Sequence, residues 1–175
     1  NTGDALNNGG VTSLLAGGAG QSGALSARVD TTTAGAKSGT VTVNYLSDGA
    51  GTSGLAAISA GNQTINVAGN MYQAAQGQIQ TAALNFGTVQ VGQSVSQALA
   101  IRNIATGAAG FVEDLNASFG ATNGTGASLI SGAGSIAGLS AGATNTGSMV
   151  VNVNTAAAGS VNGGIAVNYF TAGAV

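Results

Sequence analysis

Residues 15–45 (LAGGAGQSGALSARVDTTTAGAKSGTVTVNY) and residues 139–169 (LSAGATNTGSMVVNVNTAAAGSVNGGIAVNY) align with each other without a gap. Tyr45 aligns with Tyr169, so the two stretches are offset by 124 residues. Glycines and apolar residues coincide in this one register at Gly23 and Gly147, Val29 and Val153, Gly35 and Gly159, Gly39 and Gly163, and Val43 and Val167. Because turn glycines and strand residues match together, the alignment indicates two copies of one structural unit.

The repeat also predicts how the chain is divided. At this offset the 175 residues hold less than one and a half copies of the unit. The second copy stops soon after Tyr169, whereas the first continues into residues 46–49 (LSDG). We expect residues 1–79 to form the C-terminal part of a first repeat with a connecting strand, and residues 80–175 a second repeat truncated at its end. We also expect a segment of a longer repetitive protein, or ends that neighbouring chains complete.

Apolar and polar residues alternate in both copies, which is the period of a strand with one buried face. In residues 40–45 (TVTVNY), for example, Val41, Val43 and Tyr45 lie on one face. Further strands are expected at residues 25–29, 63–68, 83–91, 95–104, 111–119 and 149–153. Strands spaced at about ten residues and separated by Gly, Asn and Ser clusters favour an all-β fold, an antiparallel β-sandwich.

The composition argues against catalytic chemistry. The chain has no His, Cys, Trp or Pro, with three cations and five acids. Ser and Thr are abundant, but no His can serve as their base, and Lys37 is isolated in an expected turn. Glu113 and Asp114 are neighbours in an expected strand, so their carboxylates face opposite sides and cannot easily flank one bond. We therefore expect a non-enzymatic protein that needs no cofactor.

Several kinds of partner are disfavoured as well. Three scattered cations cannot neutralise a row of phosphates, which argues against nucleic acid. The sequence has no run of about eighteen apolar residues that could form a transmembrane segment. Its first residues (NTGD) lack the basic and apolar regions of a signal peptide, so we expect any export signal to lie outside this segment.

Residues 84–92 (LNFGTVQVG), followed by residues 98–103 (ALAIRN), resemble the opening strands of an Ig-like repeat. They are similar to the ASH (Hydin-like) superfamily, and more closely to the bacterial choice-of-anchor D repeats of large surface proteins. Residues 47–55, 65–72 and 111–119 also resemble segments of that repeat type. The lack of Pro and the shortage of Lys depart from its pattern. The resemblance implies Ig-like antiparallel β-sandwich repeats in a secreted protein of the bacterial cell surface, acting as a spacer, adhesin or fibre module without catalytic residues.

Five residues give the LNFGTVQVG motif its expected structural role. Phe86, Val89 and Val91 are expected to supply side chains to the core. Gly87 would allow a bulge and Gly92 a turn.

The metal that this composition allows is Ca²⁺, which takes carboxylate and carbonyl oxygens and needs no His or Cys. Residues 47–52 (SDGAGT) contain one carboxylate, that of Asp48, among flexible backbone carbonyls, and Asp30 ends an expected strand nearby in sequence. A strong Ca²⁺ site gathers two or more acids, however, and the counterpart of Asp30 in the second copy is Asn154. The alternative for Asp48 is a plain Asp-Gly turn, which we favour.

Self-association is the activity that remains. Natural β-proteins protect edge strands with Lys, Pro or inward charges, whereas this chain has no Pro and long neutral strands such as residues 163–170. We therefore expect strand addition between copies to build a homopolymer. The residues that we assign to assembly strands are Val41, Val43, Tyr45, Ile165, Val167 and Tyr169. A sugar-stacking platform of Tyr45, Tyr72 and Tyr169 is the alternative, although the repeat places Tyr45 and Tyr169 in period with core residues.

The function expected from these observations is structural and extracellular. The chain would be the subunit of a surface filament, sheath or stalk, or one slice of a giant surface protein. The first alternative is an adhesin or glycan-binding spacer module whose loops recognise a glycan or a host surface. The second is a functional amyloid, which the length of the repeated unit disfavours.

Overall fold

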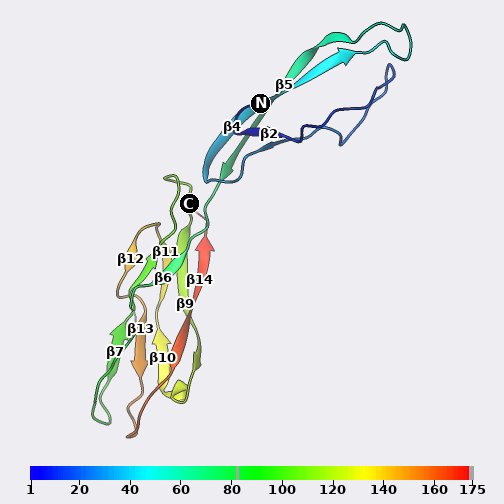
Figure 1. Cartoon of the computed structure of the whole chain (residues 1–175). Coiled ribbons are helices and arrows are strands. Elements are labelled where there is room, and N and C mark those ends of the chain that lie inside the picture. Colours follow the sequence, from blue (N-terminus) through cyan, green and yellow to red (C-terminus); the bar gives the residue numbers. More distant parts are fainter. Residues whose placement is uncertain (82, 174–175) are drawn as a thin grey trace. The chain divides into compact units, whose positions relative to one another are not determined.

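The computed structural model describes residues 1–81 and 83–173, and the regular structure of these residues is almost entirely β-strand (Figure 1). All pairings between named strands are antiparallel in this part of the chain. A single 3-10 turn, Ala127–Leu129, is the helical element of the described residues. The all-β fold class that the period-two alternation predicts is therefore confirmed.

The chain divides into two compact units, Asn1–Met71 and a second unit that begins at Tyr72. The sequence repeat predicts a boundary after residue 79 instead. The difference concerns β6 (Gly77–Ile79), which pairs with β8 (Ile101–Asn103) and so belongs to the second unit.

The first unit consists of a three-stranded sheet and a two-stranded pair. The sheet has the order β1-β4-β5, with β4 (Gly35–Ser47) in the middle and long β5 (Ile58–Met71) at one edge. On the other side of β4 lies β1 (Thr2–Gly3). The separate pair joins β2 (Ala5–Asn7) to β3 (Ala27–Val29).

The second unit holds three small antiparallel sheets. Their strand orders are β11-β9-β14, β10-β13-β7 and β12-β8-β6. The strands not yet bounded are β7 (Val95–Ala98), β9 (Asp114–Asn123), β10 (Ile130–Ala133), β11 (Ser135–Leu139), β12 (Thr144–Asn145), β13 (Val150–Val153) and β14 (Gly164–Ala172).

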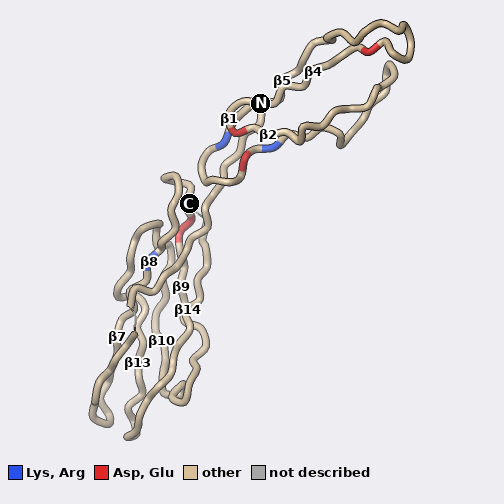
Figure 2. Tube along the Cα trace, viewed as in Figure 1, with Lys and Arg blue, Asp and Glu red and all other residues tan. Residues whose placement is uncertain are grey.

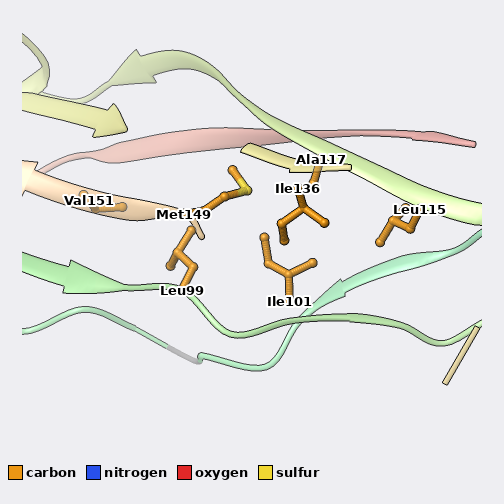
Figure 3. Packing of buried hydrophobic residues seen from close by; sticks show 7 residues of the cluster. All are labelled: Leu99, Ile101, Leu115, Ala117, Ile136, Met149 and Val151. Atoms are coloured by element: carbon orange, nitrogen blue, oxygen red, sulfur yellow. The ribbon is translucent and has the colours of Figure 1, made fainter. Parts of the chain in front are cut away.

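The core of the second unit draws on side chains from different sheets (Figure 3). Ile101 on β8, Leu115 on β9 and Met149 just before β13 are fully buried. Each such side chain stabilises the fold by roughly 1.5–3 kcal/mol relative to an exposed one. The other buried members of the cluster are Leu99, Ala117, Ile136 and Val151. The alternation along β9 and β13 thus places one face of each strand in this interior.

The internal repeat is visible in backbone hydrogen bonds as well as in sequence. The carbonyl of Ser38 accepts a hydrogen bond from the Asp4 amide at 2.9 Å. Asn162, the counterpart of Ser38, accepts one from the Gly126 amide at 2.8 Å. Ser38 lies in β4 and Asn162 lies just before β14, so the alignment matches segments that are bonded in the same way in their two units.

Asn103 is fully buried at the end of β8 and joins four segments of the second unit. Its Oδ1 accepts hydrogen bonds from the amides of Gln76 at 3.1 Å and Ala105 at 3.2 Å. Its Nδ2 donates to the carbonyls of Glu113 at 3.2 Å and Leu139 at 3.1 Å. One side chain therefore satisfies two backbone donors and two backbone acceptors, with every hydrogen-bonding position of the amide in use.

Residues 83–91 do not form the strand predicted for them. Gly87, at φ +65°, interrupts the extended backbone, and its amide donates to Asn85 Oδ1 at 2.9 Å in a local turn. Phe86 packs against the core cluster. Val89 and Val91 are 41% and 55% exposed, so the prediction that they are core residues is wrong. Gly92 lies in a turn at φ +84°.

Two other predicted strands differ in their bounds. The strand expected at residues 95–104 is two strands, β7 and β8, with Leu99 and Ala100 between them. The strand expected at residues 111–119 begins later, at Asp114.

We expect Asn103→Leu to destabilise the second unit by at least about 3 kcal/mol, because an apolar side chain leaves four backbone groups without partners. Urea unfolding at pH 7 measures the change. Asn162→Leu, at an exposed asparagine of the same unit, is the control and should stay within about 0.5 kcal/mol of the parent. Equal losses in both variants would contradict the structural role of Asn103.

Candidate assembly surface

The edges of β14 differ sharply in how they are paired. One edge forms a ladder with β9 that runs from Gly164 opposite Asn123 to Ala172 opposite Asp114. No strand of the described residues pairs with the other edge, which we call the free edge of β14. Exposed strand edges present unpaired N–H and C=O groups to which another strand can bind.

β4, the counterpart of β14, shows what this edge can hold. Thr40 aligns with Gly164 and pairs with Thr2 of β1, just as Gly164 pairs with Asn123 of β9. The β1 side of β4 is therefore the β9 side of β14. The opposite side of β4 carries β5, in a ladder from Gly35 to Ser47. The free edge of β14 is thus the edge that takes β5 in the first unit.

β5 has a free edge too. It pairs with β4 on one side, and within the described residues no strand pairs with its outer side. Its 14 residues (ISAGNQTINVAGNM) contain no charge and no Pro, and neither do the nine residues of β14 (GIAVNYFTA). Figure 2 shows that the charged residues lie on other segments. Neither edge has the Lys, Pro or inward charge that natural proteins place on exposed strands.

The predicted assembly residues fall on β4 and β14 but differ in environment. On β14, Ile165, Val167 and Tyr169 are partly buried against the core of the second unit. On β4, the corresponding Val41 is buried and Tyr45 is 44% exposed. Val43, between them, is partly buried. These side chains project from the face of the sheet, so they determine which face of each strand is apolar. The groups exposed at the strand edge are the backbone N–H and C=O groups.

Tyr45 and Tyr169 are repeat counterparts whose hydroxyls differ in exposure and in hydrogen bonding. Tyr45 donates a hydrogen bond to Gln63 Oε1 at 3.0 Å on the surface of the first unit. Tyr169 lies against Gly77, where an added Cβ would clash with its ring, and its buried hydroxyl has no partner in the described residues. Burial raises the pKa of Tyr169 above its ordinary value. Tyr72 stacks at a tilt against Phe111 with ring centroids 5.4 Å apart.

The two Ca²⁺ candidates each close a turn. Asp30 Oδ1 accepts the Thr32 amide at 2.9 Å, and Asp48 Oδ1 accepts the Ala50 amide at 2.8 Å. The two residues flank opposite ends of β4, whose 13 residues span about 40 Å, so the structure does not bring them together. Among the described residues, no three His, Cys, Asp or Glu side chains gather where they could hold a metal.

The counterpart of Asp30 makes the same turn without a charge. Asn154 Oδ1 accepts the Ala156 amide at 2.9 Å, the distance that Asp30 makes to Thr32. The hydrogen bond from the Thr32 backbone is the main cause that lowers the pKa of Asp30. Turn formation therefore accounts for both residues.

Other polar side chains are occupied by structural contacts. Lys37 Nζ lies 3.3 Å from Asp4 Oδ1 and 2.8 Å from Thr33 Oγ1. The carboxylate of Glu113 accepts a hydrogen bond from the Thr171 hydroxyl. The described residues form two shallow surface hollows, of which one is lined by a single titratable group, Asp114, and the other by none.

Comparison with protein-family models, with curated proteins and with solved structures gave no match to this chain. Within the described residues, no helix has the length and apolar character that crossing a lipid bilayer requires.

We expect Asp30→Asn to unfold at a urea midpoint slightly below that of the parent at pH 7, because the amide oxygen can close the turn as Asn154 does but does not carry the carboxylate charge. The folded pKa of Asp30 is lowered, so its stabilising contribution is present above the unfolded pKa near 3.8 and is lost as the pH falls through the folded value. Between pH 7 and pH 3 the variant should therefore lose less stability than the parent. A Ca²⁺-dependent rise of the midpoint in the parent alone would contradict the turn assignment.

Proposed function

We propose that this protein is a structural, non-catalytic, extracellular protein that builds a filament, sheath or stalk by strand addition between copies. The observation that supports this most directly is the presence of two long, uncharged, unprotected strand edges, on β5 and β14, in one chain. A chain with one free edge could only pair once. Two edges allow each copy to bind two others.

Strand addition suits a chain of this composition. Backbone hydrogen bonds supply the affinity in such contacts, and side chains at alternate positions supply the specificity. Each new ladder removes N–H and C=O groups from water and pairs them, without any charged side chain to desolvate. With eight charged residues in 175, the chain has little electrostatic repulsion to oppose association.

The extracellular setting comes from the resemblance of residues 84–92 to bacterial choice-of-anchor D repeats. The abundance of neutral Asn, Ser and Thr on the exposed faces of the strands is compatible with that setting. The Ig-like sandwich form of the repeats is part of the same proposal.

A second function, adhesion through loops, is favoured by one observation. Val11, Leu14 and Leu55 lie outside the strands of the first unit and are 83%, 65% and 71% exposed. Apolar side chains on surface loops are a common means of recognising a partner. Binding of the monomer to glycans or to a host surface would support this function.

Assembly should respond to a charge on the free edge of β14. Phe170, on β14, is 56% exposed, and Phe170→Lys should raise the concentration needed for assembly about tenfold or more. Val91, at 55% exposure in a loop, provides the matched control, because Val91→Lys adds the same charge and removes a similarly exposed apolar side chain.

Analytical ultracentrifugation over a dilution series, with electron microscopy of the same samples, measures assembly of the parent and both variants. The proposal requires oligomers or fibres of the parent and of Val91→Lys. A parent that stays a monodisperse monomer across the series would exclude assembly, and the adhesin function would take its place.

A further inference from the structure

We infer that the free edge of β14 pairs with the same edge of a second copy, antiparallel and about a two-fold axis, rather than with β5 of that copy. This inference rests on the proposed function, and it names the partner and the register of one contact. The occupant of the edge is thus β14 of another molecule of this chain.

The argument begins with the side of each strand that is free. β14 and β4 run in equivalent directions, with their apolar faces turned to equivalent sides, and the free edge of β14 is the one that in β4 holds β5. β5 runs antiparallel to β4, and its own free edge lies beyond it. Viewed from the apolar face with the strand pointing upward, the free edges of β14 and β5 are therefore on opposite sides.

This difference decides which edges can join well. In an antiparallel pair, one strand is rotated by 180° in the plane of the sheet relative to the other. The two apolar faces therefore stay on the same side of the sheet only if both strands have their free edge on the same side, left or right, in this view. β14 with β14 meets this condition, and so does β5 with β5. An antiparallel pair of β14 with β5 would instead place the apolar face of one sheet beside the polar face of the other, which the pleat makes costly.

Parallel pairing of β14 with β5 would keep the faces together, but parallel ladders are slightly less stable per residue. Every pairing between named strands in the described residues of this chain is antiparallel. Pairing of β14 with β14 is therefore favoured over pairing with β5, because it keeps the apolar faces on one side and forms an antiparallel ladder.

The sequence of β14 fits such a symmetric contact. Full overlap of Gly164–Ala172 with itself places the two-fold axis at Asn168, which then lies opposite its own copy. In this register the small Ala166 lies opposite the large, 56% exposed Phe170. Val167 lies opposite Tyr169 on the apolar face, so the cores of the two copies continue across the contact. The paired side chains are thus complementary in size and polarity.

The result is a sheet that continues from one copy to the next in the order β11-β9-β14-β14-β9-β11. A two-fold contact closes on itself, so it alone gives a dimer. The free edge of β5, which belongs to a different strand, remains available on both copies. If β14–β14 contacts alternate with β5–β5 contacts, the assembly can grow without limit.

Disulfide trapping tests the inference, because the chain has no Cys and each introduced thiol is unique. Chains of residues 1–175 that carry Ala166→Cys, Asn168→Cys or Phe170→Cys are oxidised separately at assembling concentrations. Asn168→Cys is also mixed with Thr64→Cys, which lies on the exposed face of β5. Val91→Cys, in an exposed loop, reports random collisions. Covalent dimers are quantified on denaturing gels, and the pairing of thiols is read by mass spectrometry of peptides.

We expect Asn168→Cys to give the highest yield of covalent homodimer, at least about fivefold above Val91→Cys. The reason is that the Cβ atoms of directly opposed residues in antiparallel strands lie about 4.5–5.5 Å apart. A dominant bond between positions 168 and 64 would overturn the inference while leaving assembly intact. Assembly without cross-linking at any β14 position would overturn it too. A parent that does not assemble would remove the proposed function and this inference together.

Discussion

Backbone hydrogen bonding along strand edges is the constraint on which the rest of this structure depends. Each strand residue brings an N–H and a C=O that need partners, and a chain with eight charged side chains in 175 has few other polar groups to satisfy or shield them. In the interior the requirement is met by ladders and, where ladders end, by Asn103. Along the free edges of β5 and β14 no strand of the described residues meets it, and these are the edges to which we propose that a second copy binds.

The two units show how the same strands behave with and without a full set of neighbours. In the second unit, β9 covers one edge of β14 along nearly its whole length, and Tyr169 is directed into a core built from several sheets. In the first unit, β1 covers only Thr40 and Gly39 of β4, and the counterpart Tyr45 is 44% exposed. Burial of a repeated side chain therefore depends on what packs beside the repeat as well as on the repeat itself.

The local sequence predicted the strands correctly where alternation of apolar and polar residues was the one pattern present. It predicted them poorly where turn-forming residues interrupted that alternation. Alternation located β4, β5, β13 and β14, although β5 extends well beyond the predicted residues 63–68 because pairing with β4 prolongs it. In residues 83–91 alternation predicted a buried strand, but Gly87 and the Asn85 side chain form a local turn that displaces Val89 and Val91 to the surface. Asn103 left no signal, because a buried asparagine looks like an exposed one in a single sequence.

The sequence by itself determined the class of fold, the repeat and the absence of charge from the long strands, since these depend on residue order and on local periodicity. Only the tertiary structure decided which edges stay free, because an edge is free or paired according to residues that lie far away in the chain. The same is true of the turns at Asp30 and Asn154, whose equivalence follows from backbone geometry. Whether a free edge lies to the left or the right of its strand, seen from the apolar face, depends on the direction of the strand and on which face is buried. Both are fixed only when the sheets form.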